Sequence, residues 1–545
     1  MLINRYQPIE KLLNLVEKKF YHDLDFILDI LDPNKKQNVT ADLETLGYIH
    51  HALNLDQYKK PEFRKKLFES IPPNMQIGYF KKCGIALNVP HVKKVKQAIG
   101  FEWGQNTQTK NFVDFFRYPK YMLPLEKENK ERKLEPLKML FDYQSDVVFR
   151  TLRIIEDPFK RALIQMPTGT GKTLTAVDII TRLLNQKDKQ IQILWFAHST
   201  ELLDQAYEAF VDVWKHVGNS KIKIIKFWGS EAIPKIPKEK CIFFIGYQKF
   251  RPLKGKLNPD YIFLDETHKI LAPKFKEIVE SLIDYQKGTR VVGLTATPGR
   301  GINDIQNELL LEWFRDTDVP MRIPDEKKAD EYEGNIVKYL EDEDVLSKVI
   351  PEKIYSDFEY ELSEDEWKRL KTLVEGDHPD WSLKFLKLLA NDNLRNKIIV
   401  DALKKYANEG KKILYFSTDK TQTKLVYAAL QKLGVSAVYV EDETDKTFRK
   451  QVIEIFKKTD EISVICNFNI FATGFDVPDL DVVFIGRPIN SPVLFNQMVG
   501  RGTRGEKIGG KPTFTLAQVI DKIKSPFEDF DPYEQYGFWD KYWRQ

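Results

Sequence analysis

Cysteine and excess charge are both scarce in this sequence. Only three of the 545 residues are cysteine, Cys83, Cys241 and Cys466, and they lie far apart. Such spacing excludes a disulfide framework and a CxxC zinc site, and it indicates a reducing compartment. Lys and Arg number 84 against 80 Asp and Glu, a formal charge of +4. This balance excludes a uniformly basic, histone-like binder, although a local basic channel is compatible with it.

Long apolar runs are absent too. No window holds about 18 uninterrupted apolar residues, and the opening Met-Leu-Ile-Asn-Arg-Tyr-Gln-Pro lacks the basic and apolar regions of a signal peptide. We therefore expect a cytoplasmic protein without a membrane segment. The composition is that of a globular protein, 42% hydrophobic and 30% charged, and the length allows about three or four domains.

Helical and strand-like patterns divide the chain. Residues 1–130 show helical periodicity and predict a mainly helical N-terminal domain of unknown role. From about Ala162, short β-rich apolar runs alternate with helical stretches, as expected for parallel strands buried on both faces. This rhythm stops after Arg300 and resumes near Lys353. We predict an α/β protein with two parallel-sheet lobes, at 131–320 and 351–518, separated by a solvated acidic connector at 321–350 and followed by an aromatic-rich tail at 519–545.

The two ends of the chain carry no recognisable motif. Lys-rich patches in the N-terminal domain, at 59–66 and 93–96, could extend a phosphate-binding track, but ordinary solvated helix faces are favoured. The tail combines eight aromatic residues with acidic ones that would repel phosphates. We therefore expect the tail to dock on protein, and its own second lobe is favoured over a partner's groove.

The first candidate site follows the apolar run ALIQM. Thr168-Gly169-Thr170-Gly171-Lys172-Thr173 leads from this predicted strand into a predicted helix. The glycines allow a sharp turn that aims backbone amides at phosphate oxygens. Lys172 can reach the β- and γ-phosphates of ATP, and the Thr173 hydroxyl can hold Mg²⁺. Met166 stands where the full motif has its first glycine, yet the strand-loop-helix context still predicts a phosphate-binding loop.

A phosphate-binding loop requires an acid to complete the metal site and to polarise water. Asp265 and Glu266 follow the apolar run YIFL, and the sequence between Lys172 and Asp265 accommodates about three β/α units of ~30 residues. Both motifs can therefore lie at the carboxyl edge of one sheet. We expect Asp265 to hold Mg²⁺ and Glu266 to act as the general base.

These motifs together resemble the superfamily-two DEAD/DEAH helicases, with Asp265-Glu266-Thr267-His268 in the place of DEAH. The resemblance covers about residues 135–518 and implies two RecA-like lobes that bind ATP between them. It also implies that Tyr143 and Gln144 read adenine, and that Gly474 and Asp476 belong to the nucleotide and coupling motifs. The finer character of the motifs is similar to restriction-enzyme helicase (Res) subunits and DNA-repair helicases.

The same resemblance implies a set of nucleic-acid and coupling residues. In the first lobe they are Ser199, Thr200, Gly229, Ser230, Tyr247, Gln248, Thr295 and Thr297, and in the second lobe Ser417, Thr418 and Thr473. Hydroxyl and backbone contacts of this kind bind phosphates without reading bases. For any one Ser or Thr, a helix cap or loop hydroxyl is the competing interpretation.

The last motif is Gln497-Met-Val-Gly500-Arg501-Gly-Thr-Arg504, which matches the arginine-finger pattern QxxGRxxR. Phosphoryl transfer spreads negative charge, and a guanidinium from a second domain stabilises that charge only when the cleft closes. Because Arg501 and Arg504 are three residues apart, we expect them to share one helical face and to address the same nucleotide.

The sequence therefore predicts an ATP-dependent DNA translocase or helicase that uses Mg²⁺. The analogy with restriction helicases suggests partner proteins in a DNA-processing or anti-phage defence complex. Two alternatives stay open, an RNA-dependent ATPase of the same fold and a nucleotide-gated scaffold that binds DNA without processive work.

Overall fold

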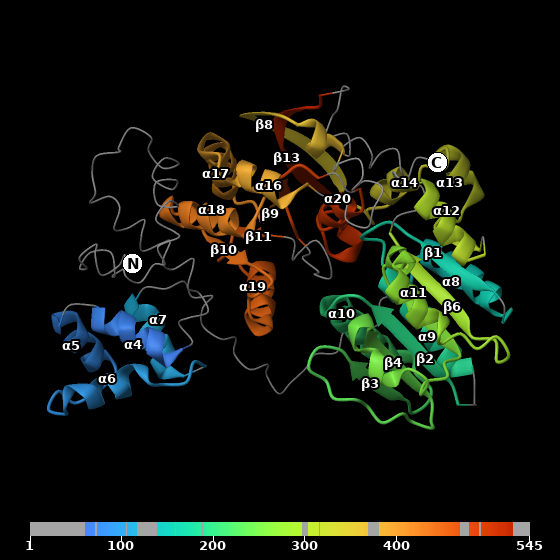
Figure 1. Ribbon diagram of the computed structural model, residues 1–545, viewed down its shortest axis with the longest axis horizontal. Coiled ribbons are helices and arrows are strands. Elements are labelled where there is room, and N and C mark those ends of the chain that lie inside the picture. Colours follow the sequence, from blue (N-terminus) through green and yellow to red (C-terminus); the bar gives the residue numbers. More distant parts are fainter. Residues whose placement is uncertain are drawn as a thin grey trace.

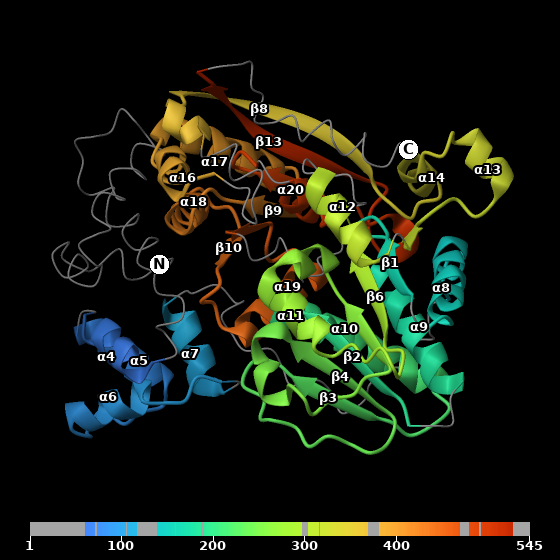
Figure 2. The ribbon, with the colours of Figure 1, turned by 45° about the vertical axis from the view of Figure 1, so that its right-hand side comes forward.

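The computed structural model describes residues 60–526, apart from 71–72, 105, 117–138, 159, 187–189, 297–303, 316, 369–380, 469–478 and 490–491. These residues form a small helical group and two larger units, each built on a parallel β-sheet (Figures 1 and 2). We name the units lobe 1, around strands β1–β7, and lobe 2, around strands β8–β13. The two sheets confirm the predicted α/β class with two RecA-like lobes.

The helical group packs around aromatic side chains. Its helices are α4 (Pro61–Ser70), α5 (Pro73–Lys82), α6 (His91–Ile99) and α7 (Thr107–Phe116). Phe68, Tyr79 and Phe112 are fully buried between them. The buried Arg64 donates to the Ile99 carbonyl (3.0 Å) and lies over the Phe101 ring, which satisfies its charge inside this core. The N-terminal region is thus helical as predicted, while the helices expected before residue 60 fall outside the described residues.

Lobe 1 is a seven-stranded parallel sheet in the order β3-β4-β2-β5-β6-β1-β7. Its strands are β1 (Arg161–Gln165), β2 (Gln192–Ala197), β3 (Lys223–Phe227), β4 (Cys241–Gly246), β5 (Tyr261–Leu264), β6 (Arg290–Thr295) and β7 (Asp318–Pro320). Its helices are α8 (Asp142–Ile155), α9 (Lys172–Gln186), α10 (Thr200–Val217), α11 (Pro273–Glu280) and α12 (Asp304–Trp313), with 3₁₀ turns η6 (Tyr247–Lys249), η7 (Arg251–Leu253) and η8 (Thr267–Leu271). Alternate residues of β1 enter separate apolar cores on the two faces of the sheet, which explains the continuous apolar runs.

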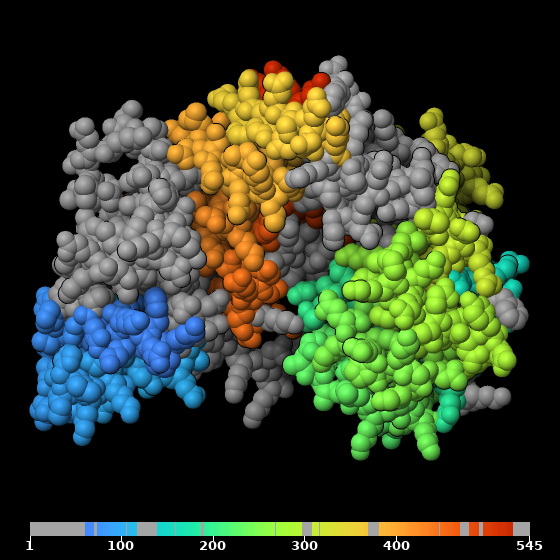
Figure 3. Space-filling view, in the orientation of Figure 1, coloured from blue at the N-terminus to red at the C-terminus, as the bar shows by residue number. Residues whose placement is uncertain are grey.

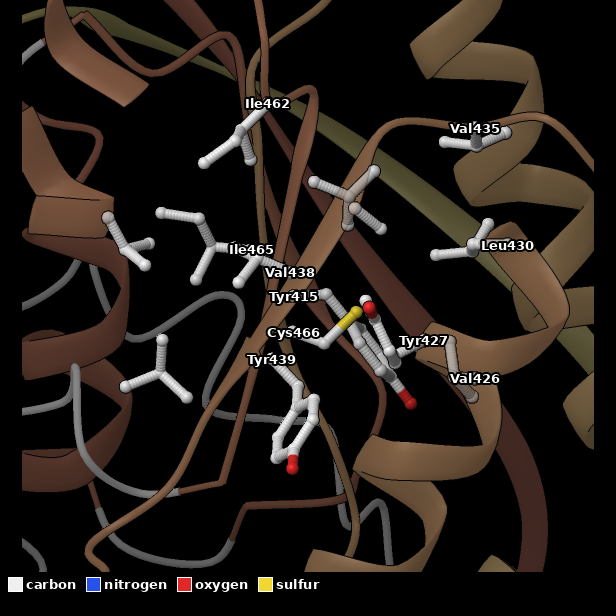
Figure 4. Close-up of a cluster of buried hydrophobic side chains, with 14 of the residues drawn as sticks. Tyr415, Val426, Tyr427, Leu430, Val435, Val438, Tyr439, Ile462, Ile465 and Cys466 are labelled. Carbon is white, nitrogen blue, oxygen red and sulfur yellow. The ribbon is translucent and has the colours of Figure 1, made fainter. Parts of the chain in front are cut away.

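Lobe 2 is a six-stranded parallel sheet in the order β10-β11-β9-β12-β13-β8. Its strands are β8 (Lys348–Glu361), β9 (Ile413–Phe416), β10 (Ala437–Val440), β11 (Val464–Asn467), β12 (Val482–Ile485) and β13 (Thr513–Lys524). Its helices are α16 (Leu383–Ala390), α17 (Asn393–Asn408), α18 (Lys420–Lys432), α19 (Lys446–Lys458) and α20 (Pro492–Val499), with the 3₁₀ turn η10 (Glu506–Ile508). Figure 4 shows Val426 and Leu430 of α18 facing Val438 and the buried, free Cys466 of the sheet.

Two expectations about the segments that flank lobe 2 need correction. The acidic stretch between the lobes is not solvated throughout, because it forms α13 (Glu326–Glu331) and α14 (Ile336–Asp342), and α14 buries apolar residues in the core of lobe 1. Strand β13 passes the predicted boundary at 518 and ends at Lys524, because Val519 and Ile523 are buried. The aromatic residues of the tail, from Phe527 onward, lie outside the described part of the chain.

The parallel strands place several loops at one edge of lobe 1. Strands β5, β6 and β1 are neighbours, so the segments after their carboxyl ends lie side by side. These segments are the Gly-rich loop, the Asp265-Glu266 pair and Thr295-Ala296. Among the helices described, none combines the length and the apolar character that crossing a membrane requires.

Candidate nucleotide site between the lobes

The Gly-rich loop links β1 to the first turn of α9. Gly169 and Gly171 have φ angles of +90° and +85°, in the left-handed region that side chains other than glycine rarely adopt. The Thr170 hydroxyl donates to the Pro167 carbonyl at 2.8 Å. The loop is thus fixed as a tight turn that ends at a helix N-terminus, a position that favours anions.

Residues of α8 support this loop from outside. Gln144 accepts from the Phe141 amide (2.9 Å) and donates to the Thr170 carbonyl (3.0 Å), and the Tyr143 hydroxyl donates to the same carbonyl (3.2 Å). A Cβ atom at Gly171 would lie 2.4 Å from the Gln144 amide nitrogen. Both predicted adenine-reading residues therefore touch the Gly-rich loop, and the Phe141 and Tyr143 rings stack at 5.5 Å beside it.

The acidic pair follows β5 in a strained turn. Asp265 is buried and accepts from the Glu266 amide at 3.0 Å. Glu266 has φ 49° and ψ 56°, a left-handed conformation that costs a non-glycine residue free energy. The Thr267 hydroxyl lies 2.7 Å from the Leu264 carbonyl and accepts from the Leu294 amide at 2.6 Å. Thr267 therefore ties the turn that carries Glu266 to the neighbouring strand β6.

Burial and mutual charge shift the ionisation of the site. Burial raises the pKa of Asp265 well above its ordinary value, the neighbouring Glu266 adds to this, and Lys172 opposes it. Burial likewise lowers the pKa of Lys172, against the attraction of Glu266 and Asp265. In the described structure the Lys172 ammonium donates to the carbonyls of Met166 (3.2 Å) and Pro167 (3.4 Å). Asp265 and Thr173 both line the cavity described below, and a carboxylate with a hydroxyl is a donor set that would fit Mg²⁺.

Lobe 2 contributes the turn that follows α20. This turn carries Arg501 and Arg504 beyond the end of the helix at Val499, so the expectation that they share a helical face was wrong. Thr503 between them donates to the Thr168 carbonyl at 3.4 Å, and a Cβ atom at Gly500 would lie 2.1 Å from the Thr168 methyl group. The absence of a side chain at Gly500 is what lets lobe 2 approach the Gly-rich loop.

The two lobes enclose one cavity of about 690 Å³. The predicted residues that line it are Tyr143, Gln144, Thr168, Gly169, Thr170, Gly171, Lys172, Thr173, Asp265, Glu266, Gln497, Arg501 and Arg504. The sequence motifs thus meet at a single site. The first and the last of them are more than 300 residues apart along the chain. The side chain of His268 is outside what the structure describes.

The arginine turn is also held by the segment that leaves lobe 1. Val345 and Leu346 lie in the core of lobe 1. Leu346 pairs with Arg504 in an isolated antiparallel bridge, and the Gly505 amide donates to the Val345 carbonyl at 2.9 Å. Sequence reasoning missed this segment, because it lies within the connector at 321–350 that was expected to be solvated.

The predicted nucleic-acid residues of lobe 1 lie at a helix start, at the exposed surface or in the buried interior. Ser199 caps α10 by accepting from the Leu202 amide at 3.2 Å, and Thr200 opens that helix. Tyr247 is buried and its ring stacks on Phe196 at 5.1 Å, whereas the adjacent Gln248 is exposed. Gly229 and Ser230 form an exposed turn after β3, and Thr295 is the buried last residue of β6.

In lobe 2, Ser417 and Thr418 are buried rather than displayed. Ser417 hydrogen bonds to the Asn467 carbonyl (3.0 Å), and Thr418 donates to the Gly486 carbonyl (3.2 Å). Both hydroxyls are therefore engaged inside the protein, and the helix-cap or loop interpretation of such residues describes them better than phosphate contact does. Thr297, Thr473, Gly474 and Asp476 lie outside the described residues.

A buried ion pair that sequence reasoning missed supports this region. Arg395 binds Asp521 through two bonds of 2.6 and 3.0 Å, and it also donates to the Gly486 carbonyl at 2.7 Å. Both side chains are inaccessible to solvent. The only signals in the sequence were a charged residue at the start of a helix and another late in β13, and neither is specific.

Two family comparisons match the two lobes separately. Residues 137–300 match "Type III restriction enzyme, res subunit", and residues 395–506 match "Helicase conserved C-terminal domain". Together the two matches cover about half of the chain.

Curated relatives match the same region. The chain is 29% identical to a "51.5 kDa protein" of a Lactococcus phage, over 63% of this chain and 62% of that one. It is 24% identical to "Putative ATP-dependent helicase IRC3" of Saccharomyces cerevisiae, over 67% of this chain and 49% of that protein. It is 26% identical to "Type I restriction enzyme EcoAI endonuclease subunit" of Escherichia coli, over 69% of this chain and 45% of that protein. The chain spans less than two thirds of the length of each of these relatives.

The family matches fall on the segments whose geometry forms the shared cavity. The first includes the Gly-rich loop and the acidic pair, and the second ends just after Arg504. Lobe 1 therefore carries a domain that matches the res subunit of type III restriction enzymes, and lobe 2 carries one that matches the conserved C-terminal domain of helicases, in agreement with the resemblance found in the sequence.

Proposed function

We propose that the chain is an ATP-dependent DNA translocase or helicase that hydrolyses ATP between its two lobes. The observation that carries this proposal is the single cavity in which the Gly-rich loop and acidic pair of lobe 1 face Arg501 and Arg504 of lobe 2. A site completed only by two lobes makes hydrolysis depend on their separation. Such dependence is what converts hydrolysis into movement along a strand.

Each residue has a separate task in this proposal. Lys172 and the Gly-rich loop bind the phosphates, while Asp265 and Thr173 would hold Mg²⁺. The metal, when bound, neutralises the phosphate charge. Glu266, fixed in its left-handed turn, accepts the proton of the attacking water. Arg501 and Arg504 stabilise the negative charge that spreads over the transferred phosphoryl group.

The preference for DNA over RNA rests on the motifs and on the restriction-enzyme relative. DETH, TATPGR and QMVGRGTR differ from the patterns of RNA helicases, and the EcoAI relative is a restriction enzyme subunit. An RNA-dependent ATPase is the second candidate, since another relative is named "Putative ATP-dependent RNA helicase MJ1505", at 23% identity.

Stimulation of ATP hydrolysis distinguishes these candidates. We expect duplex or single-stranded DNA to raise the steady-state rate at least tenfold, and RNA of equal length to raise it less than about twofold. Greater stimulation by RNA would assign the motor to RNA. A protein that binds nucleic acid but hydrolyses no ATP under any condition would be the nucleotide-gated scaffold.

We further propose that this motor acts in the cytoplasm with partner proteins of a restriction or anti-phage defence complex. The restriction-enzyme matches support this assignment. Phage plating on cells that carry the chain with its neighbouring genes tests it, and the Lys172→Ala variant is the matched control. Equal plaque numbers with the wild-type and variant chains would contradict the defence role.

A further inference from the structure

Positive charge is concentrated in the helical group α4–α7. Residues 60–116 contain ten Lys and Arg against four Asp and Glu, an excess larger than the +4 of the whole chain. The remainder of the chain is therefore net negative. The near-neutral composition thus hides a small basic domain, which stands at one side of the molecule (Figure 3).

Helix α6 presents a basic face to solvent. Val95, Ala98 and Ile99 form its buried side, and they pack into the aromatic core. The opposite side consists of exposed residues at helical spacing, namely Val92, Lys93, Lys96 and Gln97. The helix contains no acidic residue. In both views α6 lies at the outer edge of the helical group, away from the lobes (Figures 1 and 2).

Among the described residues, no ion pair joins an acid to Lys93 or Lys96. Within the described residues of the helical group, the ion pairs join Lys65 to Glu69 and Lys82 to Asp114, at 3.8 and 3.7 Å. Lys94 is engaged differently, since it donates to the Leu87 carbonyl at 3.0 Å and lies over the Phe80 ring. Lys93 and Lys96 project from the exposed side with no acid beside them on their helix. Val92, the second residue of the helix, is 80% exposed beside them.

We propose that the exposed face of α6 binds duplex DNA, as a second contact outside the cleft of the motor. Lys93 and Lys96 lie at the centre of the exposed face and bind backbone phosphates, and Val92 and Gln97 flank them. Lysines that bind backbone phosphates gain affinity through release of counterions. The charge of the face is complementary to this polyanion. Such a contact keeps the chain on its track while the lobes open and close.

Fluorescence anisotropy of a labelled ~30-base-pair duplex, with the full chain and without nucleotide, tests this assignment. The variant Lys93→Glu/Lys96→Glu reverses the charge of the α6 face. The matched control, Lys65→Glu/Lys66→Glu, makes the same change of charge on the exposed side of α4. We expect the α6 variant to weaken binding at least tenfold at ~0.1 M salt, and to reduce the slope of log affinity against log salt by about two. The control should weaken binding less than about threefold.

The outcomes are separable from those of the proposed function. Equal losses in both variants would show that the general charge of the domain acts, and unchanged binding in the α6 variant would show that this face does not bind the duplex. Either result overturns the proposal. Circular dichroism confirms that the variants are folded, and the neutral pair Lys93→Gln/Lys96→Gln should give an intermediate loss. Because binding is measured without ATP, a motor that failed to hydrolyse ATP would leave this test intact.

Discussion

At the scale of single residues, the proposed function assigns the binding of ATP and its hydrolysis to different side chains. Lys172 lies in the Gly-rich loop and bonds to loop carbonyls, whereas Glu266 stands on a strained turn after β5. Both side chains line the same cavity, yet only Lys172 belongs to the Gly-rich loop. Loss of either should therefore stop turnover for a different reason.

The substitutions Lys172→Ala and Glu266→Gln test this separation. We expect Lys172→Ala to weaken ATP binding at least tenfold, because a charge-assisted contact to phosphate is lost. Glu266→Gln should bind ATP normally, reduce kcat by about 10²–10⁴ and remain bound to nucleic acid. Binding of a fluorescent ATP analogue and the steady-state rate check both statements. An equal loss of ATP binding in the two variants would contradict the division of roles.

Thr267 positions Glu266 without touching the cavity. Its hydroxyl joins the Leu264 carbonyl and the Leu294 amide, and so fixes the left-handed turn. The substitution Thr267→Val keeps the shape and removes the hydroxyl, which should cost about 1–3 kcal/mol of stability because buried backbone groups lose their partner. We also expect kcat to fall about tenfold while KM stays unchanged. The Thr267→Ser variant, which keeps a hydroxyl, should restore both the stability and kcat. A fall in stability with wild-type kcat would show a purely structural role.

Residue identity alone did not decide which hydroxyls meet solvent. Ser417 and Thr418 follow β9 in the order that the helicase resemblance requires, yet the structure buries both in a network with Gly486 and Asn467. Tyr247 is buried in the same way against Phe196. A motif predicts where such residues stand along the chain, but burial depends on strands that pair from distant segments.

At the scale of elements, the apolar runs predicted the strands well. Runs such as YIFL and ILYF coincide with β5 and β9, because parallel strands covered on both faces leave no polar positions. The acidic stretch was harder to predict, since the four apolar residues that α14 buries are flanked on both sides by acidic sequence. Its burial depends on the adjacent core of lobe 1, which local sequence does not reveal.

The turn after α20 depends on a missing side chain. A Cβ atom at Gly500 would lie within 2.1–2.6 Å of Thr168, so Gly500→Ala should force lobe 2 away from the Gly-rich loop. We expect at least a tenfold lower ATPase rate with unchanged thermal stability of the folded lobes. The matched control is Gly78→Ala in α5, where a Cβ atom meets nothing within 4 Å. Equal rates for wild type and Gly500→Ala would show that this approach of the lobes is not needed.

The ion pair of Arg395 and Asp521 joins α17 to β13 in the interior of lobe 2. Replacing Asp521 by Asn leaves a buried guanidinium without its counter-charge, which should destabilise the lobe by about 3–5 kcal/mol. A thermal melt followed by fluorescence measures the loss. Lys522→Gln, which removes the exposed partner of Glu359, serves as the control and should not shift the melt.

At the scale of the whole molecule, the helical group and the two lobes differ in charge and in the contacts that they make. The helical group is basic, the rest of the chain is net negative, and the two lobes meet at the cavity. The lobes also meet at an ion pair between Arg449 of α19 and Glu201 of α10, at 3.3 Å. The contact places α19 of lobe 2 beside the helix that Ser199 caps. If hydrolysis moves the lobes apart, it would therefore change both the cavity and the ion pair between α19 and α10.

The most direct test of the account compares the ATPase rates of the wild-type chain and of Arg501→Ala, with and without DNA. If ATP is hydrolysed between the lobes, DNA stimulates the wild type at least tenfold. Arg501→Ala binds ATP with similar affinity yet turns over about 10³–10⁵ times more slowly. An Arg501→Ala variant that keeps the DNA-stimulated rate of the wild type would contradict hydrolysis at the interface of the two lobes.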